Sequence, residues 1–386
     1  MGGGESIEDR GAARRAGRGM LALAVALVFA GCGHLHQRVD GWALERKASL
    51  IQRDAASKET RAPLPFHSSA ELEAMTRPVP GAQMRRSPLV NHRLPEVAGL
   101  TQELLAFESA WPLRFSESDT AFAYVYRQGE LGERPVILWM PGQSTDDFTF
   151  QGLAPYLSAL VARRLDVVFF VPPYHLERTP QGFPSGDAFL ATAFPDHVAA
   201  FGQAFSDART LIAWLRAQGV RRLGAIGSSL GGSFLARLST WDEGFDFLAL
   251  LAPVIRWELL AFQPEMSPVR EGLAQSGLDI RSVLRAYRAL DPTEERPRVA
   301  PRRIAIFYGE HDRIAPKVAI FELAERWGIA RSHLRGYQSG HALLFLAPHL
   351  SRDVLATLDA ELGRIGWRWP EFERSRRAPP CFPLCR

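Results

Sequence analysis

Apolar and polar residues are arranged in alternating blocks between about residues 115 and 365. Short continuous apolar runs, which are typical of strands buried on both faces of a parallel sheet, are separated by longer segments with apolar residues at the spacing of one helix face. The pattern predicts strands at 121–126, 135–140, 166–171, 222–229, 246–251, 304–308 and 332–337, and helices at 149–164, 196–219, 317–327 and 350–365. This alternation predicts an α/β fold with a mostly parallel central sheet and helices on both faces.

Three segments depart from this alternation. Residues 254–300 are predicted to form several short helices after a strand end, so we expect a cap or lid insertion there. Its apolar wall would include Trp257, Leu259, Leu260, Phe262 and Met266. Residues 32–114 are polar and contain scattered prolines, so we expect a tether and N-terminal extension with a helix at about 42–58 and a covering helical turn near 104–111. Residues 366–386 are expected to be a C-terminal tail.

The N-terminal segment carries the pattern of an export signal. An apolar run of eleven residues spans 20–30, which suits the hydrophobic region of a signal peptide and is short for a membrane span. Ala30 and Gly31 stand before Cys32 and resemble the lipobox of bacterial lipoproteins. That resemblance implies a signal peptide at 1–31, diacylation of Cys32, and a protein exported and lipid-anchored to the bacterial cell envelope on the periplasmic side. An ordinary secretory signal and an uncleaved anchor remain the alternatives.

Composition and charge narrow the classes of function. Apolar residues make up 46% of the chain, enough for an ordinary globular core, and the net charge of +4 is spread along it without a long basic run. We therefore expect no nucleic-acid partner. The chain has three cysteines but neither a Cys-x-x-Cys motif nor a Cys/His cluster, so we expect no metal and no cofactor. Cys381 and Cys385 could form a small disulfide loop after export, or remain free thiols.

The candidate chemistry is centred on the motif Gly227-Ser228-Ser229-Leu230-Gly231. It lies between an expected strand and an expected helix, which is the setting of a nucleophilic serine at a sharp strand-to-helix turn. A glycine-rich structural turn is the alternative interpretation of the motif alone. The Gly-Lys-Ser/Thr sequence of a phosphate-binding loop does not follow, which excludes a P-loop.

A serine hydroxyl needs a base, a carboxylate that orients the base, and donors for the oxyanion. Asp312 and His341 each follow a later expected strand, and the carboxyl ends of parallel strands meet at one edge of the sheet. Glu310 is the alternative carboxylate. Leu230 is the expected first oxyanion donor because it follows the nucleophile, and the second is expected from Gly142 or Gln143 in the loop after residues 135–140.

With these motifs the chain resembles the α/β-hydrolase family. The resemblance covers roughly residues 115–365 and depends on three segments: Gly-Ser-Ser-Leu-Gly-Gly at 227–232, the run 308–316, and Ser-Gly-His at 339–341. It implies an α/β-hydrolase fold with a helical cap, in which Ser229 is the nucleophile, His341 the general base and then acid, and Asp312 its partner. Residues 172–175 and the following loop look similar to the group of alpha/beta-hydrolase domain-containing protein eighteen. His175 is expected near the mouth of the pocket.

Two functions follow as hypotheses. The first is a serine hydrolase that cleaves carboxylic esters, including acyl lipids or thioesters, through an acyl-enzyme. Its partners would be a small-molecule or lipid ester and, through the lipid anchor, a membrane. The second is a non-catalytic envelope lipoprotein that uses the same fold as a binding scaffold, because a fold does not fix a function. The sequence favours neither a peptide over an ester nor any oligomeric state.

Overall fold

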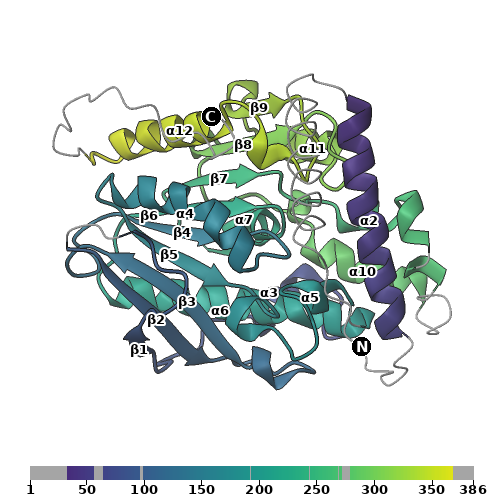
Figure 1. The fold of residues 1–386 in the computed structure, drawn as a ribbon, viewed down its shortest axis with the longest axis horizontal. Coiled ribbons are helices and arrows are strands. Elements are labelled where there is room, and N and C mark those ends of the chain that lie inside the picture. The colour runs from purple at the N-terminus through teal and green to yellow at the C-terminus, as the bar shows by residue number, and fades with distance from the viewer. Residues whose placement is uncertain are drawn as a thin grey trace, which may run out of the picture.

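The structure, a computed structural model, describes residues 33–55, 64–95, 99–191, 193–242, 244–267, 269–271 and 279–367. Within these residues, nine strands form one sheet in the order β1-β2-β3-β5-β4-β6-β7-β8-β9 (Figure 1). The strands are β1 (Arg85–Pro88), β2 (Thr101–Glu108), β3 (Thr120–Arg127), β4 (Val136–Met140), β5 (Asp166–Val171), β6 (Leu223–Ser228), β7 (Phe247–Leu251), β8 (Ile304–Gly309) and β9 (Leu334–Tyr337). Strands β4 to β9 are parallel to one another, whereas β1, β2 and β3 pair antiparallel. The predicted mostly parallel sheet is confirmed.

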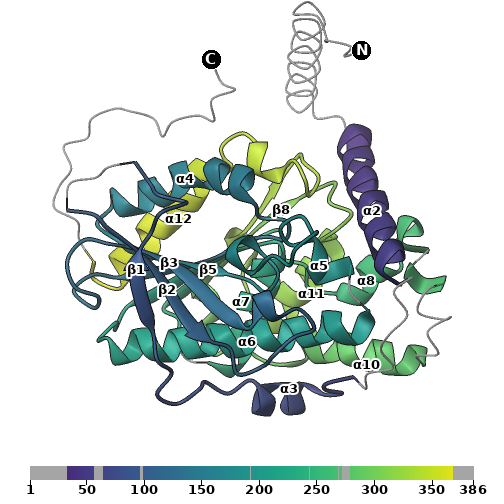
Figure 2. The same ribbon diagram turned by 60° about the horizontal axis from the view of Figure 1, so that its bottom comes forward.

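Helices cover both faces of this sheet. They are α2 (Gly33–Ala55), α3 (Ser69–Met75), α4 (Asp147–Val161), α5 (Asp187–Ala191), α6 (Phe194–Ala217), α7 (Leu230–Trp241), α8 (Trp257–Ala261), α10 (Ile280–Leu290), α11 (Lys317–Trp327) and α12 (Leu350–Arg364). Figure 2 shows α4 and α12 on one side of the sheet and α6, α10 and α3 on the other. In both views α2 runs along the flank of the molecule farthest from β1. No helix in the described residues is both long and apolar enough to cross a bilayer.

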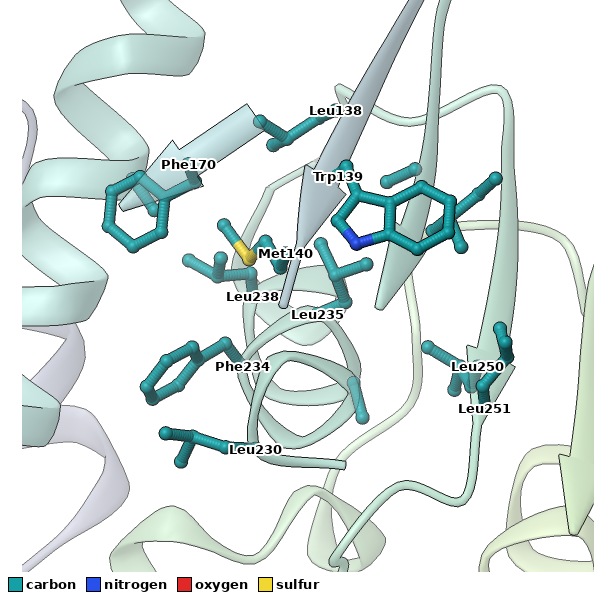
Figure 3. Close-up of a cluster of buried hydrophobic side chains, with 14 of the residues drawn as sticks. Leu138, Trp139, Met140, Phe170, Leu230, Phe234, Leu235, Leu238, Leu250 and Leu251 are labelled. Carbon is teal, nitrogen blue, oxygen red and sulfur yellow. The ribbon is translucent and has the colours of Figure 1, made fainter. Parts of the chain in front are cut away.

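Helix α7 packs against the middle of the sheet (Figure 3). Figure 3 shows Phe234, Leu235 and Leu238 of α7 beside Met140 of β4, and all four side chains are at most 1% exposed. Strand β6 leads directly into α7, so the helix must start against the sheet itself. The same packing that forms the core therefore fixes the position of the turn between β6 and α7.

The N-terminal part of the chain differs from three expectations. The covering helical turn expected near 104–111 is wrong, because Leu104, Leu105 and Phe107 lie in β2, which pairs with β3 along its length and with β1 at residues 103–106. The sheet therefore begins at Arg85, and the expected domain boundary at residue 115 falls inside it. The helix expected at 42–58 begins earlier, at Gly33.

The expected cap segment is helical where the structure describes it, at α8 and α10. Its expected helix at 269–276 lies mostly outside the described residues. The proposed apolar wall is divided between interior and surface. Trp257 is buried and packs edge-on against Phe201 of α6, with ring centroids 5.0 Å apart, whereas Phe262 is 53% exposed.

Candidate active site

Three sequence-distant side chains meet at the carboxyl ends of the parallel strands. Ser229 follows β6, Asp312 follows β8, and His341 follows β9. The Oγ atom of Ser229 lies 2.8 Å from Nε2 of His341, and Nδ1 of the same ring lies 2.8 Å from Oδ2 of Asp312. The structure thus brings together the three residues that the sequence proposed as nucleophile, base and orienting acid.

The turn at Ser229 has the geometry of a strained strand-to-helix corner. Ser229 has a φ of 50° and a ψ of −111°, a left-handed conformation that costs a non-glycine residue free energy. Glycine is required on both sides because the backbones nearly touch. A Cβ atom at Gly227 would lie 2.5 Å from the carbonyl oxygen of Gly231, and one at Gly231 would lie 2.1 Å from that of Met140. The motif therefore presents the Ser229 hydroxyl at the edge of the sheet.

Hydrogen bonds define which nitrogen of His341 carries the proton. Oδ1 of Asp312 accepts from the backbone N–H groups of Ile314 (2.8 Å) and Ala315 (2.7 Å), so Oδ2 is left to accept from Nδ1–H of His341. In the neutral ring Nε2 is then an acceptor for the Ser229 hydroxyl. Burial by itself lowers the pKa of His341, but the charge of Asp312 and its hydrogen bond outweigh burial and, with the charge of Asp40, raise the pKa above its ordinary value.

The predicted oxyanion residues lie on both sides of Ser229. Leu230 is the first residue of α7, so its N–H belongs to the helix N-terminus, where negative charge is favoured. Gly142 lies directly against the serine, since a Cβ atom there would be 3.3 Å from the Cβ of Ser229. The side-chain amide of Gln143 donates to the carbonyl of Gly186 (3.2 Å), so this amide is already engaged.

His175 supports that loop from inside, and its expected place near the pocket mouth is wrong. The ring is fully buried; Nδ1–H donates to the carbonyl of Pro173 (2.8 Å) and Nε2 accepts from the backbone N–H of Ser144 (3.2 Å). Burial lowers the pKa of His175 to about 4. The ring is therefore neutral near pH 7, as both hydrogen bonds require.

Comparisons with known proteins agree with this architecture. No protein-family model matches the sequence. Two uncharacterized proteins from two strains of Mycobacterium tuberculosis are 30% identical over 200 residues, which are 50% of this chain and 46% of theirs; the chain spans about half the length of the curated relatives it matches. An acetyl xylan esterase from a Paenibacillus species matches in structure with a TM-score of 0.55 at 12% identity, over 82% of this chain and 98% of that one. Acetyl xylan esterase 1 from a Thermoanaerobacterium species gives 0.53 at 15% identity, over 78% and 94%.

The chain has an α/β-hydrolase fold. Within that hydrolase fold, α2 and β1 stand before the antiparallel strands β2 and β3 in the chain. Sequence reasoning missed two residues of α2 that reach the site, Asp40 and Lys47. Asp40 is fully buried and accepts from the backbone N–H of His341, and Lys47 donates to the hydroxyl of Ser144. Their helix was expected as part of a tether and N-terminal extension that packs in part on the main domain, with no role at the site.

Glu310, the alternative acid proposed from the sequence, is wrong. Its carboxylate binds Lys317 (2.7 Å) and the Tyr308 hydroxyl (3.2 Å), while Asp312 holds His341. His311 contacts Gln338 rather than the serine. The described residues hold no group of three or more His, Cys, Asp or Glu side chains arranged to bind a metal ion. Cys32, Cys381 and Cys385 lie outside the described residues.

Proposed function

We propose that this protein is a serine hydrolase that cleaves carboxylic esters through an acyl-enzyme. The observation that carries the proposal is the unbroken hydrogen-bonded chain from Ser229 through His341 to Asp312, with both contacts at 2.8 Å. A serine hydroxyl is a weak nucleophile alone, and a neutral histidine at hydrogen-bond distance is the base that activates it.

In the first half-reaction the Oγ atom of Ser229 attacks the ester carbonyl while Nε2 of His341 takes the hydroxyl proton. The buried carboxylate of Asp312 stabilises the imidazolium that forms. The N–H of Leu230, with a backbone N–H of Gly142 or Gln143, would hold the negative charge on the carbonyl oxygen. The C–O bond to the alcohol then breaks, and His341 gives its proton to the leaving alcohol.

In the second half-reaction water takes the place of the alcohol. His341 removes a proton from the water as its oxygen attacks the acyl carbonyl, and the same oxyanion donors stabilise the intermediate. The bond to Oγ breaks, the proton returns to Ser229, and the carboxylic acid leaves. Both similar solved structures named above are esterases, which favours an ester over a peptide as the substrate class.

The first experiment is labelling of the full-length protein by a fluorophosphonate probe, with hydrolysis measured on p-nitrophenyl esters from acetate to palmitate. We expect the wild type to label and to turn over at least one ester, and Ser229→Ala to lose both, because the probe bonds to an activated serine oxygen. Ser87→Ala is the matched control, since Ser87 is an exposed serine on the edge strand β1.

A folded wild-type protein that neither labels nor turns over any ester of the series would contradict the proposal and leave the binding scaffold as the better interpretation. The same holds if Ser229→Ala labels as fast as Ser87→Ala. The acyl chain length that gives the highest kcat/KM identifies the size of acyl group that the site accepts.

A further inference from the structure

We propose that helix α2 is a brace that positions both halves of the active site, with Asp40 holding the loops of Asp312 and His341 and Lys47 holding the loop of Gly142. The inference rests on the proposed hydrolase function and deepens it. It assigns Asp40 and Lys47 as positioning residues, because each acts through loops that flank Ser229 rather than on the reacting atoms.

Asp40 ties together two loops that are distant in sequence. Its Oδ2 atom accepts from the backbone N–H groups of Arg313 (3.1 Å) and His341 (2.9 Å), and Oδ1 accepts from that of Ala342 (3.1 Å). The side chain is fully buried. An ionised carboxylate has only acceptor sites, so its two oxygens can accept all three of these N–H groups. One side chain thus fixes the residue after Asp312 and the backbone of His341 itself.

The approach of α2 to these loops depends on a glycine. A Cβ atom at Gly340 would lie 2.8 Å from Oδ2 of Asp40 and 3.0 Å from the carbonyl oxygen of His36. The residue before the candidate base is therefore one that leaves room for the helix. His36 packs on the same side of α2, buried and stacked on His311 with ring centroids 6.1 Å apart.

Lys47 holds the other side of the site. Its Nζ atom lies 2.6 Å from Oγ of Ser144 and 2.8 Å from Oδ1 of Asp187, whose side chain is only 1% exposed. Ser144 has a φ of 61°, so the loop after Gly142 is in a conformation that needs support from its surroundings. Lys47 joins that loop to α5 and to α2 at once.

The spacing of the two residues suits a rigid connection. Asp40 and Lys47 are two helical turns apart, so their Cα atoms are separated by roughly 10 Å along the axis at about 1.5 Å per residue. Leu44 and Ala48 on the same face are buried and help to seat the helix. A straight helix that binds one loop at each position keeps the base and the oxyanion donors at a constant separation, and misplacement by about 1 Å can cost about 10²-fold in rate.

The charged groups around His341 make the pH dependence of kcat/KM a second measurement of the role of Asp40. His341 is faced by Asp312 from the loop after β8 and by Asp40 from α2. Asp40 in turn is near His36 on its own helix, and the Arg313 guanidinium is engaged by Glu265 at 2.8 Å. Removing the charge of Asp40 therefore takes away one of the two carboxylates that favour protonated His341.

The test uses the full-length variants Asp40→Asn and Lys47→Met. Matched controls are Glu45→Gln and Arg38→Met, which remove a charge of the same sign at exposed positions of α2. We expect kcat per fluorophosphonate-titrated site to fall by about 10²-fold in each of the first two with KM nearly unchanged, because transition-state geometry is what is lost. In Asp40→Asn alone the acidic limb of the kcat/KM profile should move to lower pH, since His341 loses a proton more easily there.

The double variant Asp40→Asn/Lys47→Met tests whether the two residues act together through one helix or independently of each other. If one docked helix serves both loops, the double variant loses less than the product of the two single losses. Lys47→Arg should restore much of the lost kcat, because its guanidinium can donate to both Ser144 and Asp187.

Wild-type labelling decides the proposed function on its own, before any variant of α2 is compared. Given an active wild type, kinetics of Asp40→Asn and Lys47→Met equal to those of Glu45→Gln and Arg38→Met overturn the brace. So does a strictly multiplicative double variant. An Asp40→Asn protein that cannot fold still leaves Lys47→Met, Lys47→Arg and Arg38→Met to decide whether α2 positions the Gly142 loop.

Discussion

Asp312 and Glu310 stand two residues apart after the same strand, and the structure gives them different partners. Asp312 has a side chain with no exposed surface and a 2.8 Å contact to His341, whereas Glu310 pairs with Lys317 and Tyr308 nearer the solvent. The salt bridge with Lys317 and the Tyr308 bond account for the lowered pKa of Glu310. A carboxylate can orient His341 only if it reaches the imidazole ring. The position of each carboxylate in the loop, not its charge, therefore decides that Asp312 and not Glu310 contacts His341.

Exchanging each carboxylate for its amide tests this distinction. We expect Asp312→Asn to lower kcat by about 10⁴-fold, because an amide at this position favours the wrong tautomer of His341. Glu310→Gln should retain wild-type kinetics on the same ester, since it removes only a surface ion pair. Steady-state kinetics of the two variants side by side measure this. Equal losses in both would mean that His341 is oriented by neither acid in particular.

The residues that could be predicted from the sequence are those that follow an apolar strand. Ser229, Asp312 and His341 are all recognised this way, because a buried strand is visible as an apolar run and its carboxyl end is a known edge of the sheet. Asp40 and Lys47 lie inside a helix and have no such neighbour. Nothing in their local sequence indicates that their partners are the backbone of His341 and the loop of Ser144, because those contacts are set only by the tertiary fold.

At the scale of elements, the start of α7 lies in close backbone contact with the end of β4. The helix begins so near the sheet that a methyl group at Gly231 would lie 2.1 Å from the carbonyl oxygen of Met140 in β4 and 2.6 Å from that of Pro141. Both obstacles are backbone atoms, which cannot rotate away as a side chain can. The approach of the two elements thus depends on the absence of one side chain.

We expect Gly231→Ala to destabilise the protein strongly, by about 3 kcal/mol or more in the free energy of unfolding, because the clash forces α7 away from β4. Gly363→Ala is the matched control: it lies in α12, and a Cβ atom there meets nothing within 4 Å. The control should be neutral or stabilised by up to about 1 kcal/mol, as expected for alanine in place of a helical glycine. Urea unfolding of both variants gives the comparison, and a Gly231→Ala protein as stable as the control would mean that the close approach is not required.

The strands buried on both faces were predicted well, whereas β2 and the first part of α2 were not. Strands β4 to β8 are fully buried, so their sequences are continuous apolar runs that can be recognised directly. Strand β2 is buried only at Leu105 and Phe107. Leu104 is also apolar, so the alternation of apolar and polar residues that marks a strand is weak in this segment. Helix α2 buries His36 and Asp40 beside Leu44. Its docking face is therefore partly polar, and hydrophobic periodicity cannot identify it.

At the scale of the whole molecule, the buried histidines His175 and His197 make the free energy of unfolding depend on pH. His175 is fully buried and His197 is 5% exposed, and each has both a low pKa of about 4, caused first by burial, and a carbonyl partner for its Nδ1–H. In the unfolded chain both titrate near the ordinary value of about 6.5. Between these values the unfolded state binds the additional protons, so the contribution of these two histidines to stability falls as the pH falls from about 6.5 to about 4.

Each histidine should contribute about 3 kcal/mol to this acid loss, from the difference between the two pKa values. We expect His197→Gln to show a shallower dependence of unfolding free energy on pH in that range than the wild type, whatever its absolute stability. His67→Gln, at an exposed position, is the control and should follow the wild-type slope. Denaturant unfolding at a series of pH values measures the slopes. A His197→Gln slope equal to that of the wild type would show that His197 is protonated to the same degree in both states.

The contacts of α2 also set an order of events when the chain is made. Asp40 precedes every described strand, yet its partners His341 and Ala342 follow it by 301 and 302 residues. At about 5–20 residues per second, synthesis of that interval takes roughly 15–60 s. The contacts of Asp40 with the loop of His341 therefore cannot form until that interval of the chain has been synthesised. Because the docking face of α2 includes His36 and Asp40 beside Leu44, this segment exposes no long apolar stripe before its partners are made.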